Sequence, residues 1–210
     1  MPNLKTNTPS NNCKTLLLVD DDRLVLVTLA QGLSVKGYKI LKAESAEDAE
    51  VILAGGERPD LAIIDFSMPG KSGLELAKRL QTFDQIPFIF LSAYSDSNSV
   101  EQATEYGALS YQVKPIDPEQ LAPVIEAALA RSLELNSLKS SERALQTALD
   151  KEKEISIAIG ITMMQYRLGR KAAFELLRDA ARSRRSKLAD IASDVIKAAE
   201  TLNFDLPKNT

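Results

Sequence analysis

Three aspartates at the ends of two apolar segments are the side chains best placed to do chemistry. Asp20 and Asp21 come directly after the apolar run Thr15–Val19, and Asp65 follows the apolar residues 61–64. Short continuous apolar runs bounded by turn residues are typical of strands that are buried on both faces of a parallel sheet. Because functional residues in such sheets lie just beyond the carboxyl ends of the strands, we expect these carboxylates to share one edge.

Carboxylates gathered at one edge repel one another. Two charges about 4 Å apart repel by roughly 4 kcal/mol at an effective dielectric constant of about 20. Either a shared proton or a hard divalent cation relieves this repulsion, and an all-oxygen site that is open to water suits Mg²⁺. Such a metal orients a phosphoryl group and neutralises its charge, and a carboxylate can accept that group as a nucleophile. The pattern therefore favours phosphoryl transfer to Asp65 with Mg²⁺ as cofactor.

Two further polar side chains end predicted strands. Ser92 follows the apolar run 87–91 and offers a hydroxyl, and Lys114 follows the run 109–113 and offers an ammonium group. Both groups suit phosphate oxygens, although a serine at a strand end is usually a turn residue and a single lysine is usually solvated. The order of aspartate pair, aspartate, serine and lysine along four strand ends favours the phosphoryl site over these simpler interpretations.

The elements that must position these side chains alternate regularly along the first two thirds of the chain. The predicted strands are residues 15–19, 38–43, 61–65, 87–91 and 109–113. Each is followed by helical spacing of apolar residues; Ser45, Ser72 and Asp96 are expected helix caps, and the third helix is expected to run through Leu80. Short connections and strict alternation predict an α/β fold with a five-stranded, doubly wound parallel sheet. Periodicity does not give the strand order.

Composition limits the classes of protein that the chain can form. Its 210 residues are 44% hydrophobic and 26% charged, which is ordinary for one globular domain with an appendage. The single cysteine, Cys13, excludes an intramolecular disulfide, and the absence of histidine excludes a histidine-based triad or metal site. No apolar run approaches the roughly 18–20 residues of a membrane-spanning helix. We therefore expect a soluble, cytoplasmic protein that does not bind membranes.

Charge is distributed unevenly along the chain. Residues 1–155 carry 16 basic and 23 acidic side chains, whereas residues 156–203 carry nine and five. An acidic body with a basic end is typical of a chain whose end meets an anion such as nucleic acid, although a solvated helix face would carry the same charges. The candidate nucleic-acid-binding residues at this end are Arg167, Arg170, Lys171, Arg178, Arg182, Arg184, Arg185 and Lys187.

The apolar spacing of residues 155–202 predicts three short amphipathic helices around a small core. The basic residues then cluster at the two turns between these helices. Tyr166 is expected in the core rather than stacked on a nucleic-acid base, because it continues the apolar spacing. Gly160 is expected to permit close packing of another helix, because glycine otherwise costs a helix about 1 kcal/mol relative to alanine.

Residues 14–131 resemble a two-component response-regulator receiver domain, through the motifs LLLVDDD, LAIIDFSMPGKSGLEL, PFIFLSAYSD and YQVKP. The resemblance implies a flavodoxin-like fold in which Asp65 accepts a phosphoryl group from a sensor histidine kinase. It implies that Asp21 and Asp65 bind Mg²⁺ directly, with the backbone carbonyl of Ser67 as a third ligand and Asp20 assisting.

The same resemblance implies roles for residues of the last two strands. Ser92 is the switch hydroxyl, Tyr111 is the aromatic residue that changes rotamer with it, and Lys114 contacts the phosphoryl group. The peptide bond between Lys114 and Pro115 is expected to be cis. We expect no enzymatic activity beyond self-phosphorylation and self-dephosphorylation.

A long helix is predicted to leave the receiver domain. From Glu119 to about Ser156 the chain has no glycine, and its apolar residues, including Leu138, Leu145 and Leu149, follow a broken three-and-four spacing. Such a stripe can pair with a second chain or fold against its own receiver. We favour a homodimer through a coiled coil, with dimerisation that depends on phosphorylation as one form of control.

Residues 158–196, AIGITMMQYRLGRKAAFELLRDAARSRRSKLADIASDVI, resemble an ANTAR domain, an RNA-binding antiterminator module. The matching features include Ala158-x-Gly160, Ala173-Phe174 and Lys187-Leu188, and the sequence departs from the family at Thr162 and Arg185. The resemblance implies that the module binds paired hairpins in a nascent leader transcript and prevents the terminator from forming. Exposed hairpin loops are where RNA offers readable bases, and arginine and lysine supply phosphate contacts.

These inferences together predict a phosphorylation-dependent response regulator that acts as a transcription antiterminator. The expected divisions are a tail at 1–13, the receiver at 14–131, a coiled-coil linker at 132–155, the ANTAR domain at 156–203 and a tail at 204–210. Two alternatives stay open at this point. The chain could be a response regulator that binds DNA through its basic helices, or a receiver whose helical end only dimerises.

Overall fold

The computed structural model describes residues 13–93 and 97–202. The predicted cap Asp96 and the predicted tails, apart from Cys13, lie outside these residues. The chain divides into two compact units, Met1–Asn136 and Ser137–Thr210, which are described separately below. None of the described helices combines the length and apolar character needed to cross a bilayer.

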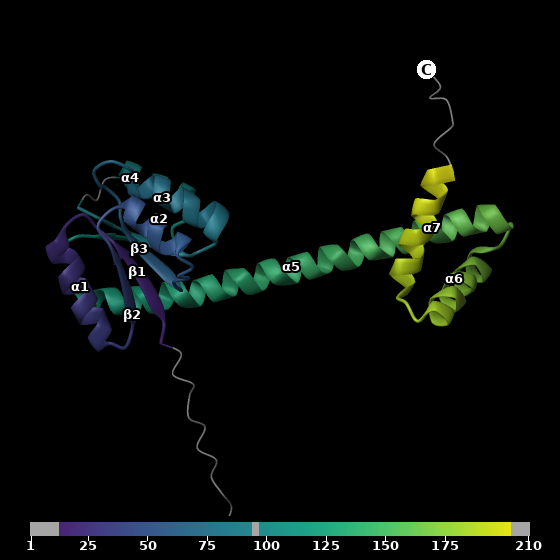
Figure 1. Ribbon diagram of the computed structural model, residues 1–210, viewed down its shortest axis with the longest axis horizontal. Helices are drawn as coiled ribbons and strands as arrows, with labels where there is room; N and C mark the ends of the chain where they lie inside the picture. Colours follow the sequence, from purple (N-terminus) through teal and green to yellow (C-terminus); the bar gives the residue numbers. More distant parts are fainter. Residues whose placement is uncertain (1–12, 94–96, 203–210) are drawn as a thin grey trace, which may run out of the picture. The chain divides into compact units, whose positions relative to one another are not determined.

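The first unit is built on one parallel sheet. Its strands are β1 (Thr15–Val19), β2 (Lys39–Ala43), β3 (Leu61–Asp65), β4 (Phe88–Ser92) and β5 (Tyr111–Val113). They lie in the order β2-β1-β3-β4-β5, and every neighbouring pair is parallel. The predicted five-stranded parallel sheet is therefore confirmed, and β1, β3 and β4 are adjacent at its centre (Figure 1).

Helices cover both faces of this sheet, as predicted. They are α1 (Arg23–Val35), α2 (Ala46–Ala54), α3 (Gly73–Arg79), α4 (Ser97–Glu105) and the first turns of α5 (Pro118–Tyr166). Alternate residues of β1 point to opposite sides: Leu17 packs with residues of α2 and α3, and Leu16 packs with residues of α1 and α5. In Figure 1, α1 and the start of α5 lie on one side of the sheet, and α2 and α3 lie on the other. Burial of apolar side chains on both faces supplies the main driving force for this fold.

The third helix departs from the prediction at its end. Ser72 caps α3 through a capping box with Glu75, but the helix does not continue through Leu80 as a regular α-helix. It passes into a π-helical turn, η1 (Leu80–Asp84). Arg79 holds this turn through an ion pair with Asp84 at 3.3 Å. A contact of this kind has no signature in the apolar periodicity.

The second unit consists of the distal part of α5, α6 (Arg170–Arg184) and α7 (Leu188–Leu202). The predicted linker and the first predicted helix of the bundle are one continuous helix of 49 residues. A small core joins the three helices: Ala158, Ile159, Ala173, Leu177, Ala181, Ile191 and Ala192. Tyr166 lies outside this core and is 57% exposed, so the prediction that it packs inside is wrong.

Gly160 lacks the close contact that the sequence led us to expect. Apart from the adjacent backbone of its own helix, a Cβ placed on Gly160 would meet no atom of the described chain within 4 Å. Because glycine costs a helix interior about 1 kcal/mol relative to alanine, Gly160→Ala should raise the free energy of unfolding by about that amount. Urea unfolding followed by circular dichroism measures the change. A loss of stability would instead show that a second molecule packs against this glycine.

Candidate functional site

The sheet register brings the predicted carboxylates together. Val19 of β1 lies opposite Ile64 of β3, so the residues that follow them, Asp20 and Asp65, emerge side by side. Carboxylate oxygens of Asp20, Asp21 and Asp65 all lie within 4.8 Å of one another. Asp20 and Asp65 are only 3% and 6% exposed, whereas Asp21 is exposed to solvent. The predicted cluster at one edge of the sheet therefore exists, with one open side.

Lys114 lies between two of these carboxylates. Its Nζ is 2.6 Å from Asp20 Oδ2 and 2.8 Å from Asp65 Oδ2. The ammonium group donates a hydrogen bond to Asp65, and its short contact with the buried Asp20 Oδ2 is likewise a charge-assisted interaction. The peptide bond that follows Lys114 is cis, as predicted.

Burial and charge act in opposite directions on the two members of this ion pair. Burial raises the pKa of the Asp20 carboxyl above its usual value, although Lys114 and the backbone amide of Asp22 oppose the change. Burial alone would lower the pKa of the Lys114 ammonium, but the charges of Asp20 and Asp65 outweigh it and raise this pKa above its usual value. The lysine is thus held fully charged at the centre of the carboxylate cluster.

The loop after β3 is tied to the Asp65 backbone and side chain. The Ser67 amide donates a hydrogen bond to Asp65 Oδ1 at 3.2 Å, which places the Ser67 backbone beside the cluster. At the start of α3, a Cβ added to Gly73 would lie 2.1 Å from the Asp65 carbonyl oxygen. Only glycine permits this approach, so the amino terminus of α3 lies directly against Asp65.

Replacing Gly73 by alanine should destabilise the first unit. The new methyl group would overlap the Asp65 carbonyl, which is backbone and cannot move aside without disturbing β3. We expect Gly73→Ala to lower the free energy of unfolding by about 1–3 kcal/mol. Urea unfolding measures the loss, and Gly160→Ala, which meets no neighbour, is the matched control and should change stability in the opposite direction. Unchanged stability of Gly73→Ala would contradict the packing described here.

Ser92 lies on β4, the strand beside Asp65, and Tyr111 lies on β5, the edge strand beyond β4. Ser92 is fully buried at the end of β4, and its carbonyl accepts a hydrogen bond of 2.7 Å from the Lys114 amide. The Tyr111 ring meets the Phe66 ring edge to face, with centroids 5.9 Å apart, and Phe66 makes a similar contact with Phe90. Sequence reasoning missed Phe66, because a single aromatic residue after a strand gives no signal of ring contacts.

The eight candidate RNA-binding residues divide into two groups. Three form ion pairs: Arg178 with Glu175, Arg182 with Asp179 at 3.7 Å, and Arg184 with Asp194 at 3.8 Å. The others form no ion pair with any described residue, and all of them are exposed: Arg167, Arg170, Lys171, Arg185 and Lys187. The second unit therefore offers positive charge that its own acidic residues do not neutralise.

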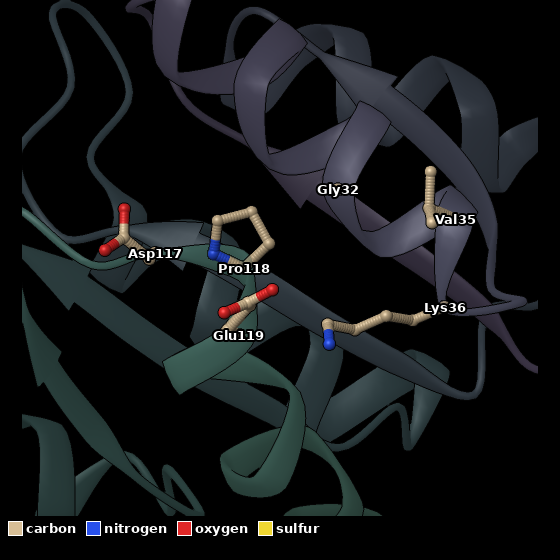
Figure 2. Close-up of a pocket in the computed structure, with 6 residues that line it drawn as sticks. All are labelled: Gly32, Val35, Lys36, Asp117, Pro118 and Glu119. Atoms are coloured by element: carbon tan, nitrogen blue, oxygen red, sulfur yellow. The ribbon is translucent and has the colours of Figure 1, made fainter.

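A separate pocket lies where α1 approaches the first turn of α5 (Figure 2). It is lined by Gly32, Val35, Lys36, Asp117, Pro118 and Glu119. A Cβ on Gly32 would lie 2.3 Å from Pro118 Cγ, so the glycine permits the two helices to meet. None of the carboxylate-cluster residues lines this pocket, and phosphoryl chemistry is not expected there.

The fold and the carboxylate cluster define a response-regulator receiver, and comparison with known families agrees. Residues 16–126 match the response regulator receiver domain family, and residues 143–196 match the ANTAR domain family. The chain belongs to the two-component response regulators, with an amino-terminal receiver domain and a carboxyl-terminal ANTAR domain. Receiver domains take phosphoryl groups from histidine kinases and generally bind Mg²⁺ at an acidic site, and ANTAR domains bind RNA.

Similar proteins support this assignment, one of them over nearly the whole chain and two over the receiver domain. The transcriptional regulatory protein PdtaR of Mycobacterium tuberculosis H37Rv is 30% identical over 197 residues, which are 94% of each chain. The phosphate regulon transcriptional regulatory protein PhoB of Pseudomonas aeruginosa is 36% identical over 122 residues, covering 57% of this chain and 53% of PhoB. A CheY-like receiver domain protein from Methanospirillum hungatei JF-1 superposes with a TM-score of 0.54 at 26% identity, covering 58% of this chain and 98% of that chain.

Proposed function

We propose that this protein is a phosphorylation-dependent regulator that binds RNA hairpins in nascent transcripts and acts as a transcription antiterminator. The observation that carries the proposal is that one chain combines a carboxylate–lysine cluster with a basic ANTAR unit. The first can receive a chemical signal, and the second can bind a polyanion. The relative PdtaR is named as a transcriptional regulatory protein, which agrees with control at the level of transcription.

In this proposal Asp65 is the phosphoacceptor. A carboxylate oxygen of Asp65 forms a bond to phosphorus while the bond from phosphorus to the sensor histidine kinase breaks. Lys114, 2.8 Å from Asp65 Oδ2, is placed to contact the transferred phosphoryl oxygens and offset their charge. Phosphate on Asp65 would then compete with Asp20 for the lysine, so the ion pairs of the cluster rearrange on phosphorylation.

The chemistry of the cluster fits Mg²⁺. Two buried carboxylates and one exposed carboxylate provide hard oxygen ligands that lie within 4.8 Å of one another. Asp20, Asp21 and Asp65 would hold the ion, together with the Ser67 backbone carbonyl. When bound, Mg²⁺ supplies positive charge beside the phosphoryl oxygens.

Magnesium should stabilise the protein through this cluster. A ligand that binds only the folded state at ten times its dissociation constant adds about 1.4 kcal/mol to the free energy of unfolding. We expect Mg²⁺ to raise the Tm of the wild-type chain, and Asp21→Asn to remove most of the rise, because Asp21 is the exposed member of the cluster. Calorimetry with and without MgCl₂, against NaCl of equal ionic strength, measures this. An equal rise in both proteins would contradict the assignment.

The switch couples Asp65 to the last two strands. Ser92 ends β4 next to β3, and Tyr111 touches Phe66, the residue after Asp65. Movement of Ser92 toward a phosphoryl group would vacate space that Tyr111 can enter, which changes the surface formed by β4, β5 and α5. Phosphorylation then shifts the receiver domain from one conformation toward another. This shift requires the two conformations to differ in their affinity for the phosphoryl group.

The output is the presentation of the ANTAR unit to RNA as a homodimer. Leu138, Leu145 and Leu149 of α5 are 58%, 67% and 60% exposed, and they supply the apolar stripe for a coiled coil between two chains. Two basic units held together would match paired hairpins in a leader transcript. The proposal is tested by binding to a hairpin RNA selected from a pool with randomised loops, in competition with duplex DNA of equal charge.

The same experiment separates the alternatives. Salt-sensitive preference for the selected hairpin supports antitermination, whereas preference for the DNA duplex would indicate a DNA-binding response regulator. If the chain forms dimers and binds neither nucleic acid, the helical end serves dimerisation alone.

A further inference from the structure

Two arginines of the ANTAR unit hold a backbone conformation that arginine rarely adopts. Arg167, after the end of α5, has a φ of 54°, and Arg185, after the end of α6, has a φ of 51°. Both values lie in the left-handed region, where the Cβ atom crowds the backbone carbonyl. Glycine, or less often asparagine, usually occupies this position after a helix.

The turns themselves do not need an arginine side chain. The Ser186 amide donates to the Ala181 carbonyl at 3.0 Å, and the Leu168 amide donates to the Met163 carbonyl at 3.1 Å. These backbone hydrogen bonds close the two helix ends, and they would form with glycine at less conformational cost. Arginine at these two positions therefore lowers the free energy of unfolding relative to glycine, and the hydrogen bonds of the turns do not compensate for this loss.

Neither guanidinium group is used inside the described part of the chain. Arg167 and Arg185 are exposed and form no ion pair with a described residue, whereas Arg182 and Arg184 are paired with aspartates. A strained, exposed and unneutralised arginine is best explained by a partner outside the chain. The positive charge and the several N–H donors of a guanidinium group fit a polyanion as this partner.

The two residues lie at opposite ends of α6. This helix has 15 residues, so the two turns are separated by roughly 22 Å along its axis. Tyr166, directly before Arg167, is 57% exposed. An exposed aromatic ring beside a cation is the combination that stacks on unpaired bases while the cation contacts a phosphate.

We propose that Arg167 and Arg185 are the principal phosphate contacts of the ANTAR unit, and that their left-handed backbone fixes the direction in which each guanidinium projects. The two side chains contact the RNA backbone at two points that are separated by the length of α6. The α5–α6 turn lies beside the bases of the hairpin loop. This assignment rests on the RNA-binding function proposed above, and it selects two residues from the eight basic candidates.

Glycine substitutions test the assignment, because they separate stability from affinity. Arg167→Gly and Arg185→Gly each remove a charge and the strain together. We expect each to weaken binding of the selected hairpin RNA by about tenfold and to reduce the slope of log affinity against log salt by about one. We expect each also to raise the Tm of the full chain, by about 2–4 °C.

Two control variants make the result specific. Gln85 has a φ of 53° in the receiver domain, so Gln85→Gly should raise the Tm and leave RNA affinity unchanged. Arg131→Gln removes an equal charge from an ion-paired residue outside the eight basic candidates and should change affinity by less than about threefold. Glycine variants that bind as tightly as the wild-type chain, or that lose affinity together with Tm, would overturn the assignment. A wild-type chain that binds no hairpin from the pool overturns the proposed function itself.

Discussion

Replacing Asp65 by asparagine should reduce phosphoryl incorporation by more than about a hundredfold, because the variant loses the attacking carboxylate. Asparagine has nearly the same shape, so the hydrogen bond from the Ser67 amide to the side-chain oxygen can persist. Lys114 keeps its second partner, Asp20, and the fold should remain intact. Intact mass after incubation with acetyl phosphate and Mg²⁺ measures incorporation as the added mass of one phosphoryl group.

Asp22 provides a matched control for this experiment. It is the third aspartate in the same run and lies outside the carboxylate cluster, where its side chain caps α1. Asparagine caps helices about as well as aspartate, so Asp22→Asn should preserve both stability and incorporation. If Asp65→Asn is phosphorylated as readily as Asp22→Asn, the phosphoacceptor has been assigned to the wrong residue.

Reversing the charge of Arg182, Arg184 and Arg185 together should abolish binding of hairpin RNA. The change replaces three positive charges with three negative charges at the turn between α6 and α7, and phosphate contacts supply most of the affinity of such interfaces. We expect a loss of at least about a hundredfold at low salt. The ion pairs that are broken are exposed, so each should cost less than about 1 kcal/mol of stability. Filter binding over a range of salt concentrations measures the affinity.

A reversal of equal size in the receiver domain is the control. Lys36, Lys39 and Lys42 are exposed on the first unit, and their replacement by glutamate changes the net charge by the same amount. This variant should retain RNA affinity within about threefold, because long-range effects of exposed charges are screened within about 10 Å at 0.1 M salt. Equal losses in both triple variants would mean that net charge, and not the ANTAR surface, determines binding.

The carboxylate cluster could be predicted because its geometry follows from topology. Parallel strands end at the same edge, so Asp20 and Asp65 had to meet once β1 and β3 were neighbours. The position of Lys114 was predicted as a contact to phosphate, but its ion pair with Asp20 was not. That contact depends on where the end of β5 lies relative to the end of β1, with β3 and β4 between them. Apolar periodicity does not predict this position.

The errors came from side chains whose environment is decided by neighbouring elements. Tyr166 continues the apolar spacing of its helix, yet its side chain is 57% exposed, although Met163 and Leu168 on either side of it pack against the core. The π-helical turn at Leu80–Asp84 is accompanied by an ion pair between Arg79 and Asp84, which apolar spacing does not predict. The left-handed conformation of Arg167 and Arg185 had no signal in the sequence, because these positions are not glycine or asparagine.

The most direct test of the central claim is the affinity of the full chain for the selected hairpin RNA, measured before and after phosphorylation of the same sample. Intact mass gives the fraction phosphorylated, and Asp65→Asn treated in parallel controls for the phosphodonor. We predict tighter binding by the phosphorylated wild-type chain and no change in the variant. Equal affinity of the phosphorylated and unphosphorylated wild-type chain would contradict the proposal that Asp65 controls RNA binding.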